Sequence, residues 1–305
     1  MRRVSLIGAA SGWGAGIRET EDGPLFLREF GLAEQLRAAG IDARWAAMVE
    51  PERRWAAAPA PTRGEVDRLV AAHNAALARE VASVARRSLP VVLGGDHSIA
   101  VGTWGGLARS FRGRFGLIWF DAHLDAHTAA TSPSQNPHGM SAAVLLGHGA
   151  PEFLAVSGGA LRPEHLCYIG VRSYEVAEWA LLRRLGARIF YMEEVRERGL
   201  AAVMADALAI VTRGTRGFGL TIDLDGFDPA DVPGVGLPVA DGLRGAEAAA
   251  VLRGIARDPR LRALEVVEYA PALDRDQRTA RLVLDLLASA LAPAGRASLP
   301  VSTAA

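Results

Sequence analysis

The chain has 305 residues, of which 50% are hydrophobic and 22% are charged. This length accommodates one large α/β domain or two smaller domains, and the composition excludes disordered and collagen-like chains. The 34 acidic residues balance 34 basic residues, all of them arginine, so no net charge favours a nucleic acid or an anionic membrane as a partner.

Short apolar runs alternate along the chain with longer segments whose apolar residues have helical spacing. The runs predict strands at 4–8, 89–93, 115–120, 165–169, 188–191, 218–222 and 261–267. Helices are predicted at 24–39, 63–87, 99–110, 175–185, 201–212, 243–257 and 277–291. This alternation is typical of a doubly wound, mostly parallel sheet with helices on both faces, a three-layer α/β/α architecture.

No long polar linker interrupts this pattern, because the proline-rich stretch at 51–61 is too short to separate two domains. We therefore expect one domain over residues 1–305, with a loose tail at 293–305. The start of the chain is too short and too glycine-rich for a signal peptide, and no apolar stretch reaches the ~18 residues of a membrane span. The one cysteine, Cys167, cannot form an intramolecular disulfide, and these features favour a cytoplasmic enzyme or binding protein.

Polar residues directly follow four of the predicted strands. Ligands of open α/β sheets bind beyond the carboxyl ends of the strands, so these residues should meet at one edge of the sheet. The segments are Gly94-Gly-Asp-His97, Asp121-Ala-His-Leu-Asp125, Asp223-Leu-Asp225 and the single residue Glu268. In isolation each Asp or His is more typical of a helix cap or a turn, but together they indicate a site.

Two of these segments place an Asp or a His at every second position, and an extended chain points such side chains to one side. Four carboxylates in one cleft repel each other and therefore require cations. The set is large enough for two ions, which would share bridging carboxylates and activate a water. Oxygen-rich ligands with only two imidazoles favour Mn²⁺, although the affinity order favours Zn²⁺. The candidate ligands are His97, Asp121, His123, Asp125, Asp223 and Asp225.

Four ordered motifs resemble the signatures of the ureohydrolases, a family that includes arginase and agmatinase, and the match is closest to bacterial arginases. The motifs are Gly94-Gly-Asp-His-Ser98, Asp121-Ala-His-Leu-Asp125, Ser134-Gln-Asn-Pro-His-Gly139 and Asp223-Leu-Asp-Gly-Phe-Asp-Pro229. The resemblance implies that His97, Asp121, Asp125 and Asp223 hold one Mn²⁺. It also implies that Asp121, His123, Asp223 and Asp225 hold the other, with Asp121 and Asp223 as bridges.

The resemblance further implies that activated water attacks the guanidinium carbon of L-arginine and releases urea and L-ornithine. Three residues would act at the reacting atoms: the ligand Asp125, His138 as a proton shuttle, and Glu268 as the partner of the guanidinium. The implied substrate-binding residues are His127, Ser132, Ser134, Asn136, Glu175 and Glu178. Family members are commonly trimers or hexamers, which implies a homo-oligomer.

Three positions depart from the usual arginase pattern. His127 stands where asparagine is usual, Glu175 where aspartate is usual, and Leu237 where threonine is usual. The loop nevertheless keeps the serines and asparagine of arginases rather than the longer loop of agmatinases, which favours arginine as the substrate. Because histidine is bulkier than asparagine, another guanidino acid or an agmatine-like amine stays open as the substrate. A metal-binding pseudoenzyme with an interaction role is the further alternative.

Overall fold

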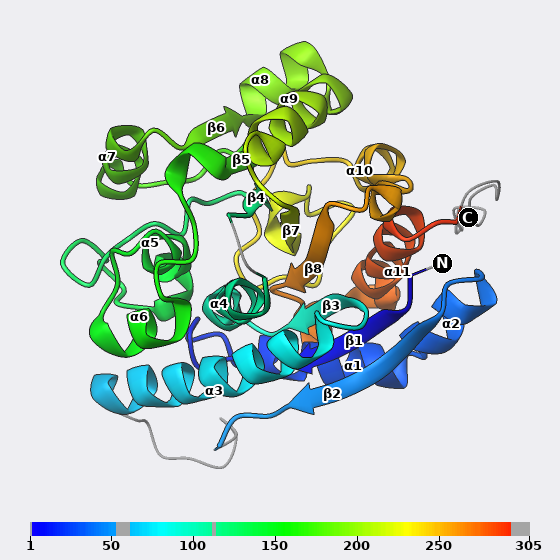
Figure 1. The fold of residues 1–305 in the computed structure, drawn as a ribbon, viewed down its shortest axis with the longest axis horizontal. Helices are drawn as coiled ribbons and strands as arrows, with labels where there is room; N and C mark the ends of the chain where they lie inside the picture. Colours follow the sequence, from blue (N-terminus) through cyan, green and yellow to red (C-terminus); the bar gives the residue numbers. More distant parts are fainter. Residues whose placement is uncertain (1, 53–61, 112–113, 294–305) are drawn as a thin grey trace.

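The centre of the molecule is a parallel β-sheet (Figure 1). The computed structural model describes residues 2–52, 62–111 and 114–293, so most of the predicted tail and of the proline-rich stretch lies outside the described residues. Among the described residues, eight strands form one sheet in the order β2-β1-β3-β8-β7-β4-β5-β6, and every neighbouring pair is parallel. The strands are β1 Val4–Ala9, β2 Ala43–Val49, β3 Leu89–Gly94, β4 Gly116–Phe120, β5 Leu166–Val171, β6 Arg188–Tyr191, β7 Phe218–Asp223 and β8 Leu261–Val267.

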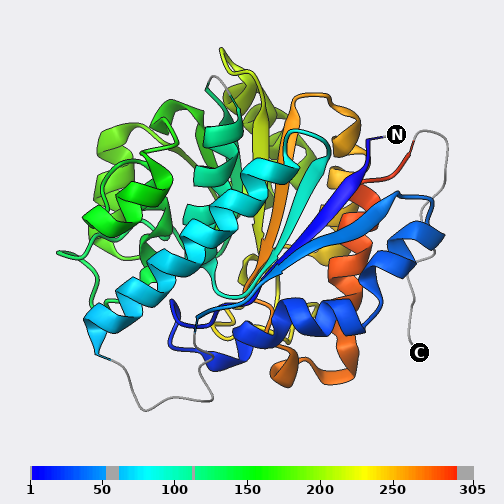
Figure 2. The same ribbon diagram turned by 60° about the horizontal axis from the view of Figure 1, so that its bottom comes forward.

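Helices cover both faces of this sheet (Figures 1 and 2). The first face carries α3 Arg63–Val84, α4 Ala100–Ser110, α5 Ser141–Leu145, α6 Pro151–Ser157 and α7 Val176–Leu185. The second face carries α1 Gly23–Glu29, α2 Leu32–Ala38, α8 Met192–Arg198, α9 Leu200–Thr212, α10 Gly245–Leu252 and α11 Arg278–Ala290. The predicted three-layer fold class is confirmed.

Alternate side chains of each central strand enter two different cores. In β4, Ile118 and Phe120 pack under the helices of the second face, whereas Leu117 and Trp119 pack under α3 and α4. All four side chains are buried. A strand that is buried on both faces must be apolar throughout, and this explains why the central strands were visible in the sequence as continuous apolar runs.

Several predicted boundaries were wrong, for identifiable reasons. The single helix expected at 24–39 is two helices, because Gly31 between them has a left-handed φ of 77°. The helix expected at 243–257 ends as α10 at Leu252, and Gly254 follows with a φ of 69°. Strand β2 was missed because it pairs only with β1 at the sheet edge, and its alanine-rich sequence lacks the usual signal of β-branched residues. The short helices α5, α6 and α8 were also missed.

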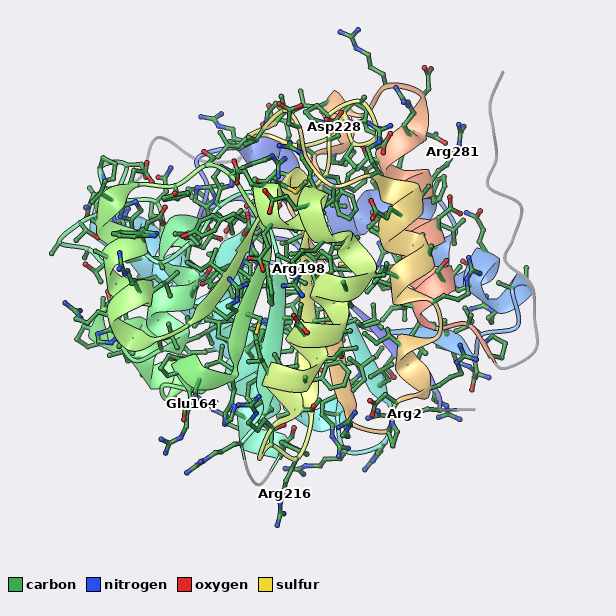
Figure 3. The ribbon with its side chains drawn as sticks, turned by 90° about the horizontal axis from the view of Figure 1, so that it is seen from above. Arg2, Glu164, Arg198, Arg216, Asp228 and Arg281 are labelled. Carbon is green, nitrogen blue, oxygen red and sulfur yellow. The ribbon has the colours of Figure 1, made fainter. Side chains whose placement is uncertain are left out.

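The four strands that precede the candidate site residues are consecutive in the sheet, in the order β3-β8-β7-β4. Their carboxyl ends therefore bring distant sequence segments together. Charged side chains such as Glu164, Arg216 and Arg281 project from the periphery (Figure 3). None of the described helices combines the length and the apolar character that a membrane crossing requires.

Candidate active site

The loop after β3 places His97 at the centre of the site. Asp96 accepts a hydrogen bond from the backbone N–H of Ser98, at 2.9 Å, and so caps the short helical turn that carries His97. Gly95 is required just before this turn, because a Cβ atom there would lie 1.8 Å from the carbonyl oxygen of Ser11. The close approach of the two loops sets the position of the imidazole.

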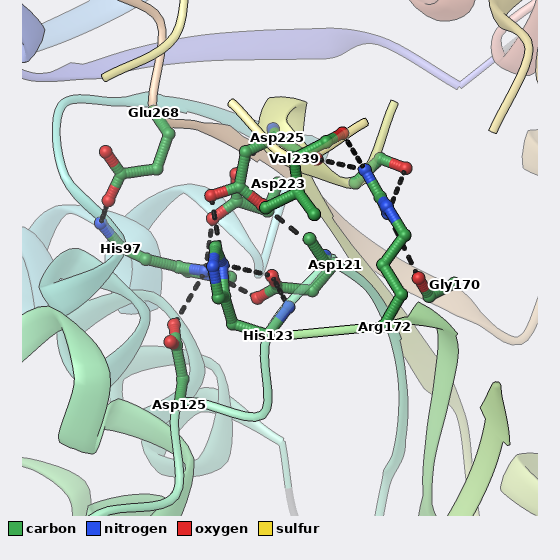
Figure 4. Close-up of polar contacts among 12 residues, drawn as sticks. His97, Asp121, His123, Asp125, Gly170, Arg172, Asp223, Asp225, Val239 and Glu268 are labelled. Atoms are coloured by element: carbon green, nitrogen blue, oxygen red, sulfur yellow. Dashed lines mark hydrogen bonds and ion pairs between the residues drawn. The ribbon is translucent and has the colours of Figure 1, made fainter. Parts of the chain in front are cut away.

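The first group of candidate ligands converges on the Nδ1 atom of His97 (Figure 4). This atom lies 2.8 Å from Asp223 Oδ2, 3.1 Å from Asp125 Oδ2 and 3.4 Å from Asp121 Oδ2. It is buried, and it makes no hydrogen bond within the described part of the chain. A buried, unsatisfied ring nitrogen that faces three carboxylates fits a bound divalent cation.

The second group is formed by Asp121, His123 and Asp225. His123 Nδ1 lies 3.2 Å from Asp225 Oδ2 and 3.5 Å from Asp121 Oδ1. Asp121 thus directs one oxygen to each imidazole, as a bridging carboxylate would. Asp223, the other implied bridge, belongs to the first group only, and its Oδ1 accepts the backbone N–H of Asp225 at 2.9 Å.

Without a cation, the cluster satisfies its charges with protons. Burial raises the pKa of Asp225 to about 6, and burial and neighbouring carboxylates raise the pKa of Asp223 well above its usual value. Burial alone would lower the pKa of His97, but the three carboxylates that face its ring outweigh burial and raise this pKa. The same balance raises the pKa of His123. Divalent cations would replace these protons, so metal binding must release protons.

A buried chain of hydrogen bonds orients His97 through Nε2, the ring nitrogen that points away from the three aspartate carboxylates. The Thr221 hydroxyl donates to Glu265 Oε1 at 2.8 Å and lies 3.1 Å from His97 Nε2. Because this hydroxyl donates to Glu265, it accepts from His97 Nε2–H, and the Nδ1 lone pair is left for a metal. Trp104 Nε1 also donates to Glu265 Oε1, and Trp119 Nε1 donates to Asp121 Oδ2.

The sequence interpretation missed these supporting residues. A signal existed in Glu265, which lies between the apolar residues Leu264 and Val266 of strand β8, because a buried carboxylate needs hydrogen-bond donors. It also missed Arg172, whose guanidinium donates to backbone carbonyls of the turn around Asp225. Its acceptors are the carbonyls of Gly170, Asp225, Gly226, Phe227, Val239 and Ala240 (Figure 4).

His138 and Glu268 form a pair beside the first ligand group. His138 Nδ1 lies 3.2 Å from Glu268 Oε1, which also accepts the backbone N–H of His97 at 2.8 Å. Burial would lower the pKa of His138, but Glu268 outweighs it and raises the pKa to about 9. Glu268 has a φ of 66° and Asp125 a φ of 49°, conformations that non-glycine residues rarely adopt. Such backbone strain is typical of functional sites.

His127, Glu175 and Glu178 are also brought together. His127 Nε2 lies 3.0 Å from Glu175 Oε2 and 3.7 Å from Glu178 Oε2, and its Nδ1 lies 3.1 Å from the hydroxyl of Thr131. Both ring nitrogens of His127 are therefore engaged inside the protein. The two unusual residues, His127 and Glu175, contact each other.

The other predicted substrate-binding residues lie on the loop before His138. Ser132 Oγ accepts the backbone N–H of Gln135, and Ser134 Oγ accepts that of Asn136. The Asn136 amide donates to the Ala15 carbonyl. Ser132 is buried and Ser134 exposed. Each serine hydroxyl keeps its own hydrogen for donation to a ligand.

Comparison with known proteins identifies relatives over almost the whole chain. A family model described as the arginase family matches residues 2–292. The arginase of Bacillus caldovelox is 38% identical over 295 residues, which cover 95% of this chain and 98% of that protein. Its native structure at pH 5.6 superposes with a TM-score of 0.89 at 36% identity, covering 97% of this chain and 100% of that one.

A more distant relative has been solved with a ligand. The arginase of Entamoeba histolytica, in complex with L-ornithine, superposes with a TM-score of 0.87 at 26% identity and covers 95% of this chain and 98% of that one. The family model and the Bacillus relative each span nearly all of this sequence. This chain therefore belongs to the arginase family.

Proposed function

We propose that this protein is a binuclear metal hydrolase that converts L-arginine and water into urea and L-ornithine. The observation that carries the proposal is the pair of ligand groups that share Asp121, with the His138–Glu268 pair beside them. Full-length similarity to arginases supports arginine as the substrate. The carboxylate-rich ligand set supports Mn²⁺ as the metal.

Two divalent ions bound by these groups supply a water molecule of lowered pKa. His97, Asp121, Asp125 and Asp223 would hold one ion, and Asp121, His123, Asp223 and Asp225 the other. These assignments differ from the two observed groups only in that Asp223 would bind both ions. Asp121 and Asp223, which are both buried, would then keep the two ions together.

The protein groups next to the metals handle the guanidinium and the proton. Glu268 is buried and offers a carboxylate that can pair with the planar guanidinium cation through two parallel hydrogen bonds. His138 is bound to Glu268 through Nδ1, so Nε2 is the nitrogen left to exchange a proton with the reacting groups. His138 would deliver that proton to the amine that leaves as ornithine.

The far end of the substrate would meet the loop hydroxyls and the glutamates. Ser132 and Ser134 can donate to the α-carboxylate together with Asn136, and the exposed Glu175 can accept from the α-ammonium. His127 would act through Glu175, which it contacts, rather than as a free donor to the carboxylate. This contact also supports a second candidate, the hydrolysis of a related guanidino compound with a different polar end.

The remaining properties follow from family membership and the fold. We propose that residues 1–305 form one ureohydrolase domain, because a single sheet contains every described strand and the family model spans 2–292. We also propose a homo-oligomer, a trimer or hexamer, that acts in the cytoplasm on a small guanidino substrate.

A panel of guanidino compounds tests the proposal. Protein loaded with Mn²⁺ would be incubated with L-arginine, agmatine, 4-guanidinobutanoate and D-arginine, and urea and the amine product would be measured. We expect L-arginine to have the highest kcat/KM. A higher kcat/KM for another compound would establish the second candidate, and no urea from any of them would support a metal-binding pseudoenzyme.

A further inference from the structure

A third group of metal-ligating side chains lies next to the two groups of the binuclear centre. It consists of His127, Glu175 and Glu178, one ligand atom from each lying within 4.8 Å of the others. His127 follows Asp125 by two residues, and the intervening Ala126 donates its backbone N–H to Glu178. We propose that this group is a third metal site, which takes one Zn²⁺ ion and regulates the enzyme by excluding substrate.

The spacing of the donor atoms is close to that of a tetrahedral zinc site, and shifts of a few tenths of an ångström would complete the fit. His127 Nε2 lies 3.0 Å from Glu175 Oε2 and 3.7 Å from Glu178 Oε2. In a tetrahedral zinc site with bonds of about 2.0–2.2 Å, donor atoms are about 3.3–3.6 Å apart. One neutral imidazole and two carboxylates form a donor set of charge −2, which matches the charge of Zn²⁺ and leaves a fourth position for water.

Two of the three ligands are already held in place. The Glu178 side chain is 3% exposed, and its oxygens accept the backbone N–H groups of Glu175 at 3.0 Å and Ala126 at 3.3 Å. The His127 side chain is 8% exposed, and Thr131 holds its Nδ1 on the side opposite the glutamates. A metal-ligating histidine almost always has such a partner on its other ring nitrogen.

The third ligand provides access. The Glu175 side chain is 62% exposed, so an ion can enter from solvent and keep a water in the open position. A buried carboxylate is stabilised by nearby positive charge, and the Glu178 side chain is only 3% exposed. A divalent cation would supply that charge.

The regulatory part of the inference rests on the proposed function, whereas the metal site itself does not. Glu175 is the group proposed to accept the α-ammonium of arginine. A cation bound to Glu175 would repel that ammonium and occupy its place. Zn²⁺ should therefore raise KM for L-arginine with little change in kcat.

Metal stoichiometry tests the site directly. Protein carrying two Mn²⁺ would be dialysed against micromolar Zn²⁺ with Mn²⁺ kept constant, and both metals would be measured per chain. We expect two Mn²⁺ and one Zn²⁺ in the wild type and in the control variant His148→Asn, which changes an exposed histidine outside the group. His127→Asn should lose the Zn²⁺ and keep both Mn²⁺.

A second variant guards against a folding defect in the first. Thr131→Val keeps all three ligands and removes only the hydroxyl behind His127, so Zn²⁺ should bind about 10- to 100-fold more weakly. The site is overturned if Zn²⁺ replaces Mn²⁺ so that the total stays at two. It is also overturned if the third ion binds only at millimolar concentration, or equally well to all variants. Failure of the proposed function would appear separately, as an absence of urea from the Zn²⁺-free, Mn²⁺-loaded protein.

Discussion

Replacing Thr221 with valine should weaken metal binding without touching any ligand. The Thr221 hydroxyl lies between His97 Nε2 and Glu265 Oε1, both fully buried. Valine fills the same space, but His97 Nε2 and Glu265 Oε1 each lose a hydrogen-bond partner. Each buried group left without a partner costs about 1–3 kcal/mol. Because Trp104 still donates to Glu265, we expect the metal-free protein to lose about 2–4 kcal/mol of unfolding free energy. Mn²⁺ affinity should fall about 10- to 100-fold, because His97 loses the bond that fixes its tautomer.

Two measurements and two further variants check this reasoning. Urea denaturation in the presence of a chelator gives the stability of the metal-free protein, and equilibrium dialysis gives Mn²⁺ affinity. Thr221→Ser keeps the hydroxyl and should restore the affinity, at a cost of about 1 kcal/mol for the lost methyl group. Thr212→Val, which removes a hydroxyl bonded to a carbonyl in α9, should leave Mn²⁺ affinity unchanged. Wild-type Mn²⁺ affinity in Thr221→Val would refute the proposed role of the hydroxyl.

Four other predictions follow from the same geometry. Asp225→Ala should reduce bound Mn²⁺ from two to one and remove most urea release while the circular dichroism spectrum stays native; full activity at limiting Mn²⁺ would contradict this. His138→Ala should keep both ions but lower kcat by about 10² to 10⁴; loss of the metals would mean that His138 is a ligand. His127→Asn should change KM for L-arginine more than kcat, since His127 contacts Glu175, and identical kinetics on every substrate would remove His127 from the substrate pocket. Burial lowers the pKa of His73 from 6.5 to about 4, so folding opposes protonation of this residue. The unfolding free energy should therefore fall as the pH drops below 6.5, by about 2 kcal/mol at pH 5. With a chelator present, His73→Gln should lose less stability in acid than the wild type, and equal acid sensitivity of the two proteins would disprove this role of His73.

The fold class was predictable because the central strands are buried on both faces. Leu117 through Phe120 are all apolar for that reason, and such a run can be recognised as a strand without knowing which strands pair with it. The clustering of the candidate metal ligands was predictable, because they follow the carboxyl ends of three strands, and the structure brings them together. Edge strand β2 was not predictable, because its partial burial leaves its sequence with no clear period.

Contacts between residues far apart in the sequence could not be predicted from the sequence alone. Nothing in the sequence links Thr221 to Glu265. They become neighbours because the register of β7 and β8 pairs these two residues. The contact of His127 with Glu175 spans 48 residues. Both residues were visible as departures from the arginase pattern, but only the structure shows that they contact each other.

The proposed requirement for two metal ions can be tested by measuring urea release from L-arginine during stepwise addition of Mn²⁺ to the metal-free protein. The ligand groups around His97 and His123 share Asp121, so full activity requires both ions. We predict negligible urea without metal and a rate that rises to its maximum at two Mn²⁺ per chain. Urea release by the metal-free protein, or no urea from protein shown to carry two Mn²⁺, would contradict the account.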